Sequence, residues 1–302
     1  MEIMNLLKTL LLSFFPVIYI TGIIGNIFSL YIFSKKKFKN TIFEIYFRLL
    51  NVTYMLALSY VIFDYMNFQF DYNLEIKSPF SCKIIYYIYF TFPPIGSWIL
   101  VIISLNIMIC VLYPLRFRQI RNSKRIQIVI CLIIIVYNFC FYIEIIFKQE
   151  LNIPVNDDSN ETNQTGKTTH LECNSNEVIY WMDFFNSAFL PSILMIIFTT
   201  IMIKQLIKSR LKLSKKDIRF MFVSIFLNVF FLISNLPIVI FNFIRNYTDI
   251  HDEMSELIFI LVIIPYYVSF ADVFFISFFI NKYFKNEVLK LLRFIFNSKV
   301  TN

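Results

Sequence analysis

Glycine is scarce in this chain, with 4 among 302 residues, which argues against a glycine-rich nucleotide-binding fold and excludes a collagen-like repeat. Charged residues make up 16% of the sequence, whereas a soluble domain has about 25%. The 5 cysteines are far too few for a disulfide-dense secreted scaffold. Intrinsic disorder is also excluded, because disordered chains are highly charged and poor in hydrophobic residues.

Hydrophobic residues are abundant instead, at 58% of the sequence, and 37 residues are phenylalanine. A soluble protein of this length has too little interior to bury so much apolar surface. A helix needs roughly 20 apolar residues to cross a bilayer, and the stretches that qualify are about 10–34, 42–66, 80–113, 126–148, 178–207, 217–244 and 255–279. The sequence therefore predicts an all-α membrane protein, a seven-transmembrane helix bundle in which residues 1–302 form one domain.

Lysine and arginine gather in alternate loops. The loops after the first, third and fifth spans, together with the tail, hold 21 of the 28 basic residues. The positive-inside rule makes that side cytoplasmic, so the N-terminus is predicted to be extracellular. The net charge of +8 is then mostly a cytoplasmic collar beside membrane lipid, and nucleic acid is not a predicted partner.

Three glycosylation sequons lie in loops that this orientation places outside the cell, and they begin at Asn160, Asn163 and Asn246. Glycosylation requires an extracellular or luminal loop, so their positions agree with the predicted topology. The first span is too long for a cleaved signal peptide and is followed at once by lysines, so it is interpreted as a membrane span.

The cysteines divide into two groups by position. Cys110, Cys131 and Cys140 lie inside spans, where small packing residues are expected. Cys82 lies at the outer start of the third span and Cys173 in the loop before the fifth, and both face the oxidising compartment, so a disulfide between them is predicted. The two histidines are isolated in outer loops, and no metal site or cofactor is predicted.

Several short motifs carry a resemblance to a known family. Gly25-Asn26 stands in the first span, Phe189-Leu190-Pro191 in the fifth, and Phe231 with Pro237 in the sixth, while Pro114-Leu115 follows the third span. In order and spacing they resemble the rhodopsin-like (class A) G-protein-coupled receptors, in particular invertebrate peptide-receptor-like or chemosensory members. The resemblance implies a receptor in the plasma membrane, with no enzymatic activity, that senses an extracellular peptide or small amphipathic molecule and signals by helix rearrangement to a heterotrimeric G protein.

The chain departs from the family at its switch residues. Asn106-Ile107-Met108 replaces the acidic-Arg-aromatic triplet, Asn51 replaces the second-span aspartate, and Asn235 replaces the sixth-span tryptophan. Ile107 has neither charge nor donor, so its presence either raises basal activity or abolishes coupling, and the sequence does not choose. A receptor-shaped binder without G-protein coupling is therefore an alternative. A seven-span ligand-gated channel, with its N-terminus inside, is disfavoured by the positions of the basic loops.

The candidate residues form two sets. Buried polar groups in a membrane seek partners, so Asn51, Asn235 and Asp272 are predicted to form a polar chain through the bundle. The switch and network candidates are Asn26, Asn51, Asn106, Ile107, Phe231, Pro237 and Asp272. Aromatic walls with a few polar groups suit a ligand pocket. The pocket candidates are Asp64, Tyr86, Tyr89, Asp183, Asn186, Asn235, Tyr266 and Tyr267.

Three features bear on the ligand. Tyr89 stands where amine receptors keep an aspartate, which argues against a biogenic amine. The seventh span contains no lysine before Lys282, so an opsin-type retinal Schiff base is excluded. Acidic residues in the outer loops give a negative outer face that favours the approach of a cationic peptide.

Two further expectations concern helix geometry. Pro93-Pro94 lies inside the third span, and because proline removes a helix donor and clashes with the preceding turn, a local break is predicted there. In the tail, apolar residues recur at helical spacing with basic residues between them, which predicts an amphipathic helix over about 282–296 lying on the inner leaflet.

Overall fold

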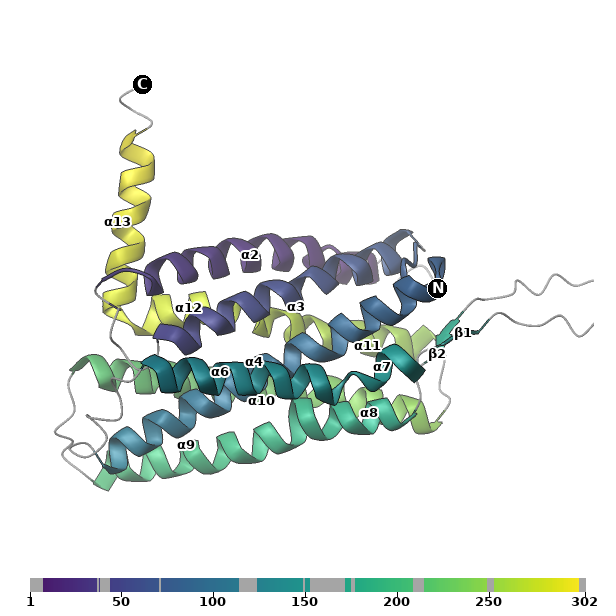
Figure 1. Ribbon diagram of the computed structural model, residues 1–302. Coiled ribbons are helices and arrows are strands. Elements are labelled where there is room, and N and C mark those ends of the chain that lie inside the picture. The colour runs from purple at the N-terminus through teal and green to yellow at the C-terminus, as the bar shows by residue number, and fades with distance from the viewer. Residues whose placement is uncertain are drawn as a thin grey trace, which may run out of the picture.

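The computed structural model describes residues 8–36, 38, 44–70, 72–113, 124–148, 150–152, 172–174, 177–208, 215–248 and 253–298. It is a bundle of long apolar helices (Figure 1). Within the described residues, six helices are long and apolar enough to cross a membrane, and a bent pair makes a seventh span when it is counted as one. The predicted seven-helix architecture is confirmed.

The spans follow the predicted order. They comprise α2 (Phe14–Phe33), α3 (Glu44–Phe70), α4 (Pro79–Leu112), α6 (Lys124–Phe141) with α7 (Glu144–Lys148), α8 (Glu177–Asp183) with the π-helix η2 (Phe184–Phe189) and α9 (Leu190–Lys208), α10 (Lys215–Thr248), and α11 (Glu253–Ser269) with α12 (Asp272–Ile280). The remaining elements are the short helix η1 (Glu75–Lys77), the strands β1 (Glu150–Asn152) and β2 (Glu172–Asn174), and α13 (Lys282–Ser298).

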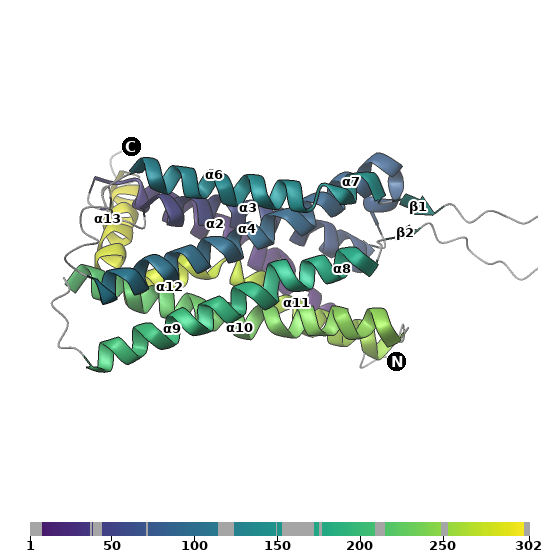
Figure 2. The ribbon, with the colours of Figure 1, turned by 60° about the horizontal axis from the view of Figure 1, so that its bottom comes forward.

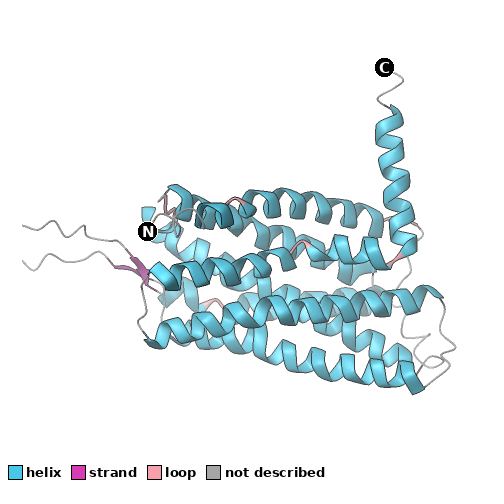
Figure 3. Cartoon of the chain, turned by 180° about the vertical axis from the view of Figure 1, so that it is seen from behind, coloured by secondary structure: helices cyan, strands magenta, loops and turns pink. Residues whose placement is uncertain are grey.

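The two ends of the bundle differ in structure. Strands β1 and β2 pair antiparallel, with Leu151 opposite Cys173, at the end where α2 begins (Figures 1 and 2). Helix α13 lies at the opposite end and runs across the bundle axis, as the view from behind also shows (Figure 3). Its residues include the whole range predicted for the tail helix. Its direction suits a helix that lies along the membrane surface rather than across it.

Capping residues in the local sequence fix where helices begin at the two ends of the bundle. Ser78 and Ser81 form a reciprocal capping box at the start of α4, in which each hydroxyl accepts from the other's backbone N–H at 3.0 Å, and Pro79 occupies the first turn. Between α12 and α13, the buried Asn281 accepts from the backbone N–H of Tyr283 at 3.1 Å. The Asn281 amide thus caps α13 where the chain changes direction.

Helix α4 continues through both prolines, so the break predicted at Pro93-Pro94 is wrong. Both residues are buried against neighbouring helices, and the Ser97 hydroxyl donates to the Pro93 carbonyl at 3.3 Å. Neighbouring helices and serine side chains hold a proline-containing transmembrane helix together in this way. Packing therefore outweighs the local effect of the two rings.

The break lies instead in the seventh span, where Leu257–Ser269 and Asp272–Ile280 meet at 56°. At the break, the backbone N–H groups of Phe270 and Ala271 bond three residues back, to Tyr267 and Val268. The carbonyl of Phe270 accepts instead from Nδ2 of Asn26 on α2, at 2.8 Å. A buried side chain from the first span thus satisfies a backbone group that the break releases.

Glycine allows two helices to approach closely at the centre of the bundle. A Cβ atom added at Gly96 of α4 would lie 2.5 Å from Cε1 of Tyr54 on α3, a ring that is itself buried. We expect Gly96→Ala to lower the free energy of unfolding by about 1–3 kcal/mol, because a fixed ring must move. The melting temperature in detergent measures this.

Gly25→Ala is the matched control for that variant. A Cβ atom there would lie 3.1 Å from its nearest neighbour, Cβ of Phe274, so a smaller loss is expected. An equal loss at Gly25 and Gly96 would contradict the explanation by the Tyr54 ring.

Candidate functional site

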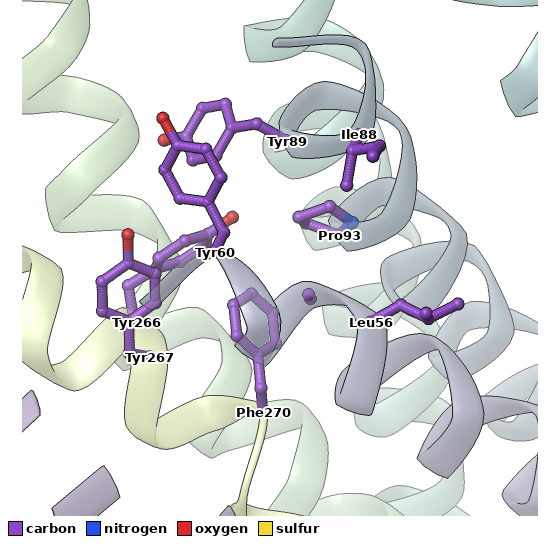
Figure 4. Close-up of a pocket in the computed structure, with 9 residues that line it drawn as sticks. Leu56, Tyr60, Ile88, Tyr89, Pro93, Tyr266, Tyr267 and Phe270 are labelled. Carbon is purple, nitrogen blue, oxygen red and sulfur yellow. The ribbon is translucent and has the colours of Figure 1, made fainter. Parts of the chain in front are cut away.

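A small pocket lies between α3, α4 and α11 (Figure 4). Its lining is apolar and aromatic, and consists of Leu56, Ala57, Tyr60, Ile88, Tyr89, Pro93, Tyr266, Tyr267 and Phe270. The cavity volume is about 10 Å³, which is about the room one water molecule needs. Drug-sized ligands occupy pockets of about 300–1,000 Å³, so a ligand larger than water requires the aromatic side chains to move apart.

The tyrosines of the pocket pack on one another. The rings of Tyr60 and Tyr89 lie 4.4 Å apart between centroids, and those of Tyr266 and Phe270 lie 4.8 Å apart. The hydroxyl of Tyr267 donates to Oδ2 of Asp64, which links α11 to α3. The structure thus brings together four of the pocket candidates, Asp64, Tyr89, Tyr266 and Tyr267.

A second group of polar residues is centred on the buried Asn186 of η2. Its Oδ1 accepts from Nε1 of Trp98 at 2.9 Å and from the hydroxyl of Tyr137 at 3.2 Å. Its Nδ2 donates to Oδ1 of Asn138 at 2.9 Å and to the hydroxyl of Tyr142 at 3.2 Å. The Asn186 amide therefore uses all four of its hydrogen-bonding positions and joins α4, α6 and the fifth span.

Asp183 is the next acceptor along this network. The hydroxyl of Tyr142, a fully buried residue, donates to Oδ1 of Asp183 at 3.2 Å. The ring of Tyr142 stacks 6.3 Å from Phe90, which contacts Tyr86 and Tyr89. The candidates Tyr86, Asp183 and Asn186 thus connect to the pocket tyrosines through Phe90 and Tyr142, which the sequence analysis did not single out.

Asn235 does not line the pocket. Its Nδ2 donates to the carbonyl of Phe231, one turn earlier in α10, at 3.1 Å. Asn51 likewise donates to the carbonyl of Phe47 on its own helix. Within the described residues, no hydrogen bond joins Asn51, Asn235 and Asp272, so the polar chain predicted through these three is wrong. The physical reason is that an asparagine on a helix can bond the carbonyl four residues back.

Three buried side-chain oxygens of the switch and network candidates have no hydrogen-bond partner among the described residues. Asp272, the first residue of α12, is buried, and its Oδ1 has no hydrogen-bond partner among the described residues. The same holds for Oδ1 of Asn26 and of Asn51 in the described bundle. A buried acceptor without a partner costs free energy, so a rearrangement that pairs these oxygens is favoured at these positions.

A polar network that the sequence analysis missed lies in the half of the bundle nearer α13. Asn228 of α10 donates from Nδ2 to the hydroxyl of Ser104 on α4 at 2.7 Å and to that of Thr199 on α9 at 2.9 Å. Ser224, one turn before Asn228, lies 3.4 Å from Ser104 between hydroxyl oxygens. The four-residue spacing of Ser224 and Asn228 on one helix face was the available signal.

Toward the end of the bundle that carries α13, Ile107 is buried inside α4, and Asn106 donates to the carbonyl of Ile102 at 2.8 Å. Aromatic rings close this end of the bundle. This aromatic cluster consists of Phe33, Phe38, Phe47, Phe220 and Phe284, all buried. Within it, the ring centroid of Phe220 on α10 lies 6.1 Å from that of Phe47 and 6.4 Å from that of Phe38. Beside the cluster, Cζ of Arg219 lies 4.8 Å from the ring centroid of Tyr283 on α13. Phe231 and Pro237 lie farther along α10, where Pro237 is within the helix.

Two buried carboxylates add ion pairs at the same end. Glu287 of α13 lies 3.3 Å from Nζ of Lys35 and 3.6 Å from Nζ of Lys290. Glu44 of α3 lies 3.7 Å from Nζ of Lys124 on α6 and 3.6 Å from Arg48. These pairs connect α13 to the end of α2, and α3 to α6.

The candidate residues that the sequence predicts to be extracellular are only partly described. Asn160 and Asn163 lie outside the described residues, and Asn246 falls in the last turn of α10. Cys82 is buried in the first turn of α4. The backbone of Cys173 lies in β2, a strand that contacts η1 just before α4.

The family model described as "7 transmembrane receptor (rhodopsin family)" matches residues 25–277, which is most of the chain. No curated protein matches the chain.

Proposed function

Because the chain belongs to the rhodopsin family of seven-transmembrane receptors, we propose that it is a plasma-membrane receptor whose ligand binds among the pocket tyrosines and rearranges the helices. The family is one of receptors rather than enzymes, and the proposed activity involves no catalysis. The proposed ligand is a peptide or a small amphipathic molecule, and the proposed cytoplasmic partner is a heterotrimeric G protein.

One observation carries this proposal: Phe270 lines the pocket and also lies at the break between α11 and α12. A ligand that enters must separate the rings around Phe270, since the cavity holds about one water molecule. Displacing Phe270 moves the backbone that accepts from Asn26. Ligand binding is thereby coupled to α12, which leads directly to α13 at the cytoplasmic end.

A ligand screen tests the proposed function. Cells that express the chain, together with reporters for all G-protein classes, are exposed to pooled peptides and small molecules. We expect a saturable response that falls at least about tenfold in potency for Phe270→Ala, because the coupling ring is lost. Phe279→Ala, an exposed position on α12, is the control at equal surface expression. An equal response from the Phe270 variant would refute the coupling route.

A receptor-shaped binder without G-protein coupling is the second candidate function. The observation that favours it is the buried Ile107 at the position of the family's arginine. It predicts that a ligand identified by direct binding leaves every G-protein reporter silent, whereas a reporter response to that ligand eliminates this candidate.

We also propose that the N-terminus is extracellular. Helix α13 and the ion pairs of Lys35 and Lys124 lie at one end, whereas the β1–β2 ribbon and Cys82 belong to the other. The proposal predicts N-glycosylation in the loop of Asn160 and Asn163. Deglycosylation should increase the gel mobility of protein from a glycosylating host, and Asn160→Gln with Asn163→Gln should reduce that shift. An unglycosylated chain at the cell surface would count against this orientation.

The Cys82–Cys173 disulfide remains a proposal with structural support. Cys82 is buried in the first turn of α4, whereas Cys110, Cys131 and Cys140 are free thiols. The β2 backbone at Cys173 pairs with β1, which contacts α4. This bond would hold the ribbon against the outer end of α4, and its identity can be tested by non-reducing peptide mapping.

A further inference from the structure

The pocket between α3, α4 and α11 has one aliphatic side. In Figure 4, Leu56 and Ile88 lie on the side of the pocket away from Tyr266 and Tyr267. Leu56 is 41% exposed, and Val52, one turn earlier on α3, is 37% exposed. An exposed apolar residue within a membrane span faces hydrocarbon. This side of the pocket therefore faces the acyl chains of the bilayer.

The pocket also lies at the depth of the acyl-chain ends. Leu56 is near the middle of α3 (Glu44–Phe70), and Pro93 is near the middle of α4 (Pro79–Leu112). Phe270 lines the pocket at the break of the seventh span. Lipids place their polar heads at the two membrane surfaces and the ends of their chains between them. The part of a lipid that reaches this pocket is therefore the end of a chain rather than a head.

The lining suits an apolar group. Among the described residues that line the pocket, none is charged, and the hydroxyl of Tyr267 donates to Asp64. A polar group buried here without a partner would cost free energy. An apolar cavity of about 10 Å³ stays dry and leaves its walls without van der Waals contacts on that side. A chain end that fills the cavity supplies those contacts without breaking a hydrogen bond.

Tyrosines close the pocket toward the end of the bundle where β1 and β2 lie. The rings of Tyr60 and Tyr89 are 4.4 Å apart between centroids. One turn beyond Tyr60, Asp64 accepts from Tyr267 and so links α3 to α11. A water-soluble ligand that enters from this end must separate the rings or break that hydrogen bond. A chain that enters from the bilayer displaces only the aliphatic side.

We infer that this pocket takes the hydrocarbon chain of a membrane-dissolved amphiphile, which enters from the bilayer between Leu56 of α3 and Ile88 of α4 while its polar head stays at the membrane surface. This inference rests on the proposed function and specifies its ligand class, because it selects the small amphipathic molecule over the peptide. Such a ligand needs little internal volume, since most of it remains in lipid. Its chain end contacts Phe270, the pocket residue at the helix break.

A photoreactive alcohol tests the inference. The protein, in nanodiscs of phosphatidylcholine, is irradiated with hexadecanol that carries a diazirine at its methyl end, and the labelled peptides are identified by mass spectrometry. We expect labelling around Leu56 and Ile88 that saturates and is displaced by unlabelled hexadecanol. The isomer with its diazirine beside the hydroxyl should not label these residues, because the head stays at the surface.

Two substitutions at the entrance sharpen the test. Leu56→Trp fills the entrance from α3 and should abolish the saturable labelling, and Ile88→Trp should do the same from α4. Val52→Trp is the matched control, because it places the same ring on the lipid-facing side of α3 at a residue that does not line the pocket. The control should keep the labelling. Labelling that never saturates, that persists in both entrance variants at native melting temperature, or that falls equally in the control would overturn the inference.

Labelling does not depend on signalling, so this inference and the proposed function fail separately. Saturable labelling of a protein whose reporters stay silent throughout the ligand screen would count against the receptor function alone. A peptide agonist whose response requires Phe270 but is unchanged in Leu56→Trp would overturn this inference and leave the receptor function standing.

Discussion

Replacing Phe220 with alanine is expected to open the end of the bundle that carries α13 and to raise ligand-independent signalling several-fold. Phe220 is 1% exposed and connects α10 to Phe47 of α3 and to Phe38. Removing a buried phenylalanine side chain costs about 3–5 kcal/mol, and these contacts exist only while the helix ends are together. Since receptor states differ by a few kcal/mol, such a loss shifts the population toward the open state.

The measurement is the distance between spin labels at the first turns of α10 and α6, together with the basal activity of the G-protein reporters. Phe226→Ala is the control, because Phe226 lies on the same helix but is 53% exposed. It should leave both readouts unchanged. An unaltered distance distribution in the Phe220 variant, at native levels of folded protein, would eliminate the closing role of the cluster.

This closure explains how the bundle holds its end without the arginine of the family. Arg219 stacks 4.8 Å from the ring of Tyr283 on α13, and Phe220 follows it into the aromatic cluster. At this end of the bundle, the aromatic contacts of α10 come from α3, α13 and Phe38, while Asn228 bonds α10 to Ser104 of α4 farther along the helix. Restoring arginine at position 107 is a poor test of coupling, since Ile107 is 2% exposed and a guanidinium there would be buried without a partner.

The spans could be predicted from the sequence because their hydropathy is a property of each segment alone. The breaks could not, as two regions demonstrate. Pro93-Pro94 carries the strongest local signal for a break, yet α4 passes through it, while the seventh span breaks at Phe270 and Ala271 without a proline at either residue. What decides is whether another helix supplies partners for the released backbone groups, as Asn26 does, and that is a long-range effect.

The site was predictable to the extent that residue type and depth define it. Asp64, Tyr89, Tyr266 and Tyr267 meet as a group because tyrosines and acids at one depth of a bundle tend to face one another. Asn235 is a polar residue at a depth that suits a pocket residue, but its side chain donates a hydrogen bond to a backbone carbonyl of its own helix. Asn186 lies in a π-helical segment, whose extra residue changes the rotation of the helix. No 3.6-residue pattern could place its four partners.

Asn186→Leu is expected to cause the largest loss of stability among the pocket candidates. The amide accepts from Trp98 and Tyr137 and donates to Asn138 and Tyr142. A leucine of similar size leaves buried groups of these neighbours without partners, and each costs about 1–3 kcal/mol. Most of the folded protein should therefore be lost at physiological temperature, measured as the melting temperature in nanodiscs and as surface expression.

Asn235→Leu is the matched control, since the substitution, the burial and the membrane setting are the same. Asn235 donates to the Phe231 carbonyl of its own helix, a carbonyl in an α-helix that ordinarily accepts a backbone bond as well. Its removal leaves no cross-helix group unpaired, so the melting temperature should change little or rise. If the melting temperature falls equally in both variants, the loss results from replacing any buried asparagine. In that case the Asn186 network does not hold α4, α6 and the fifth span together.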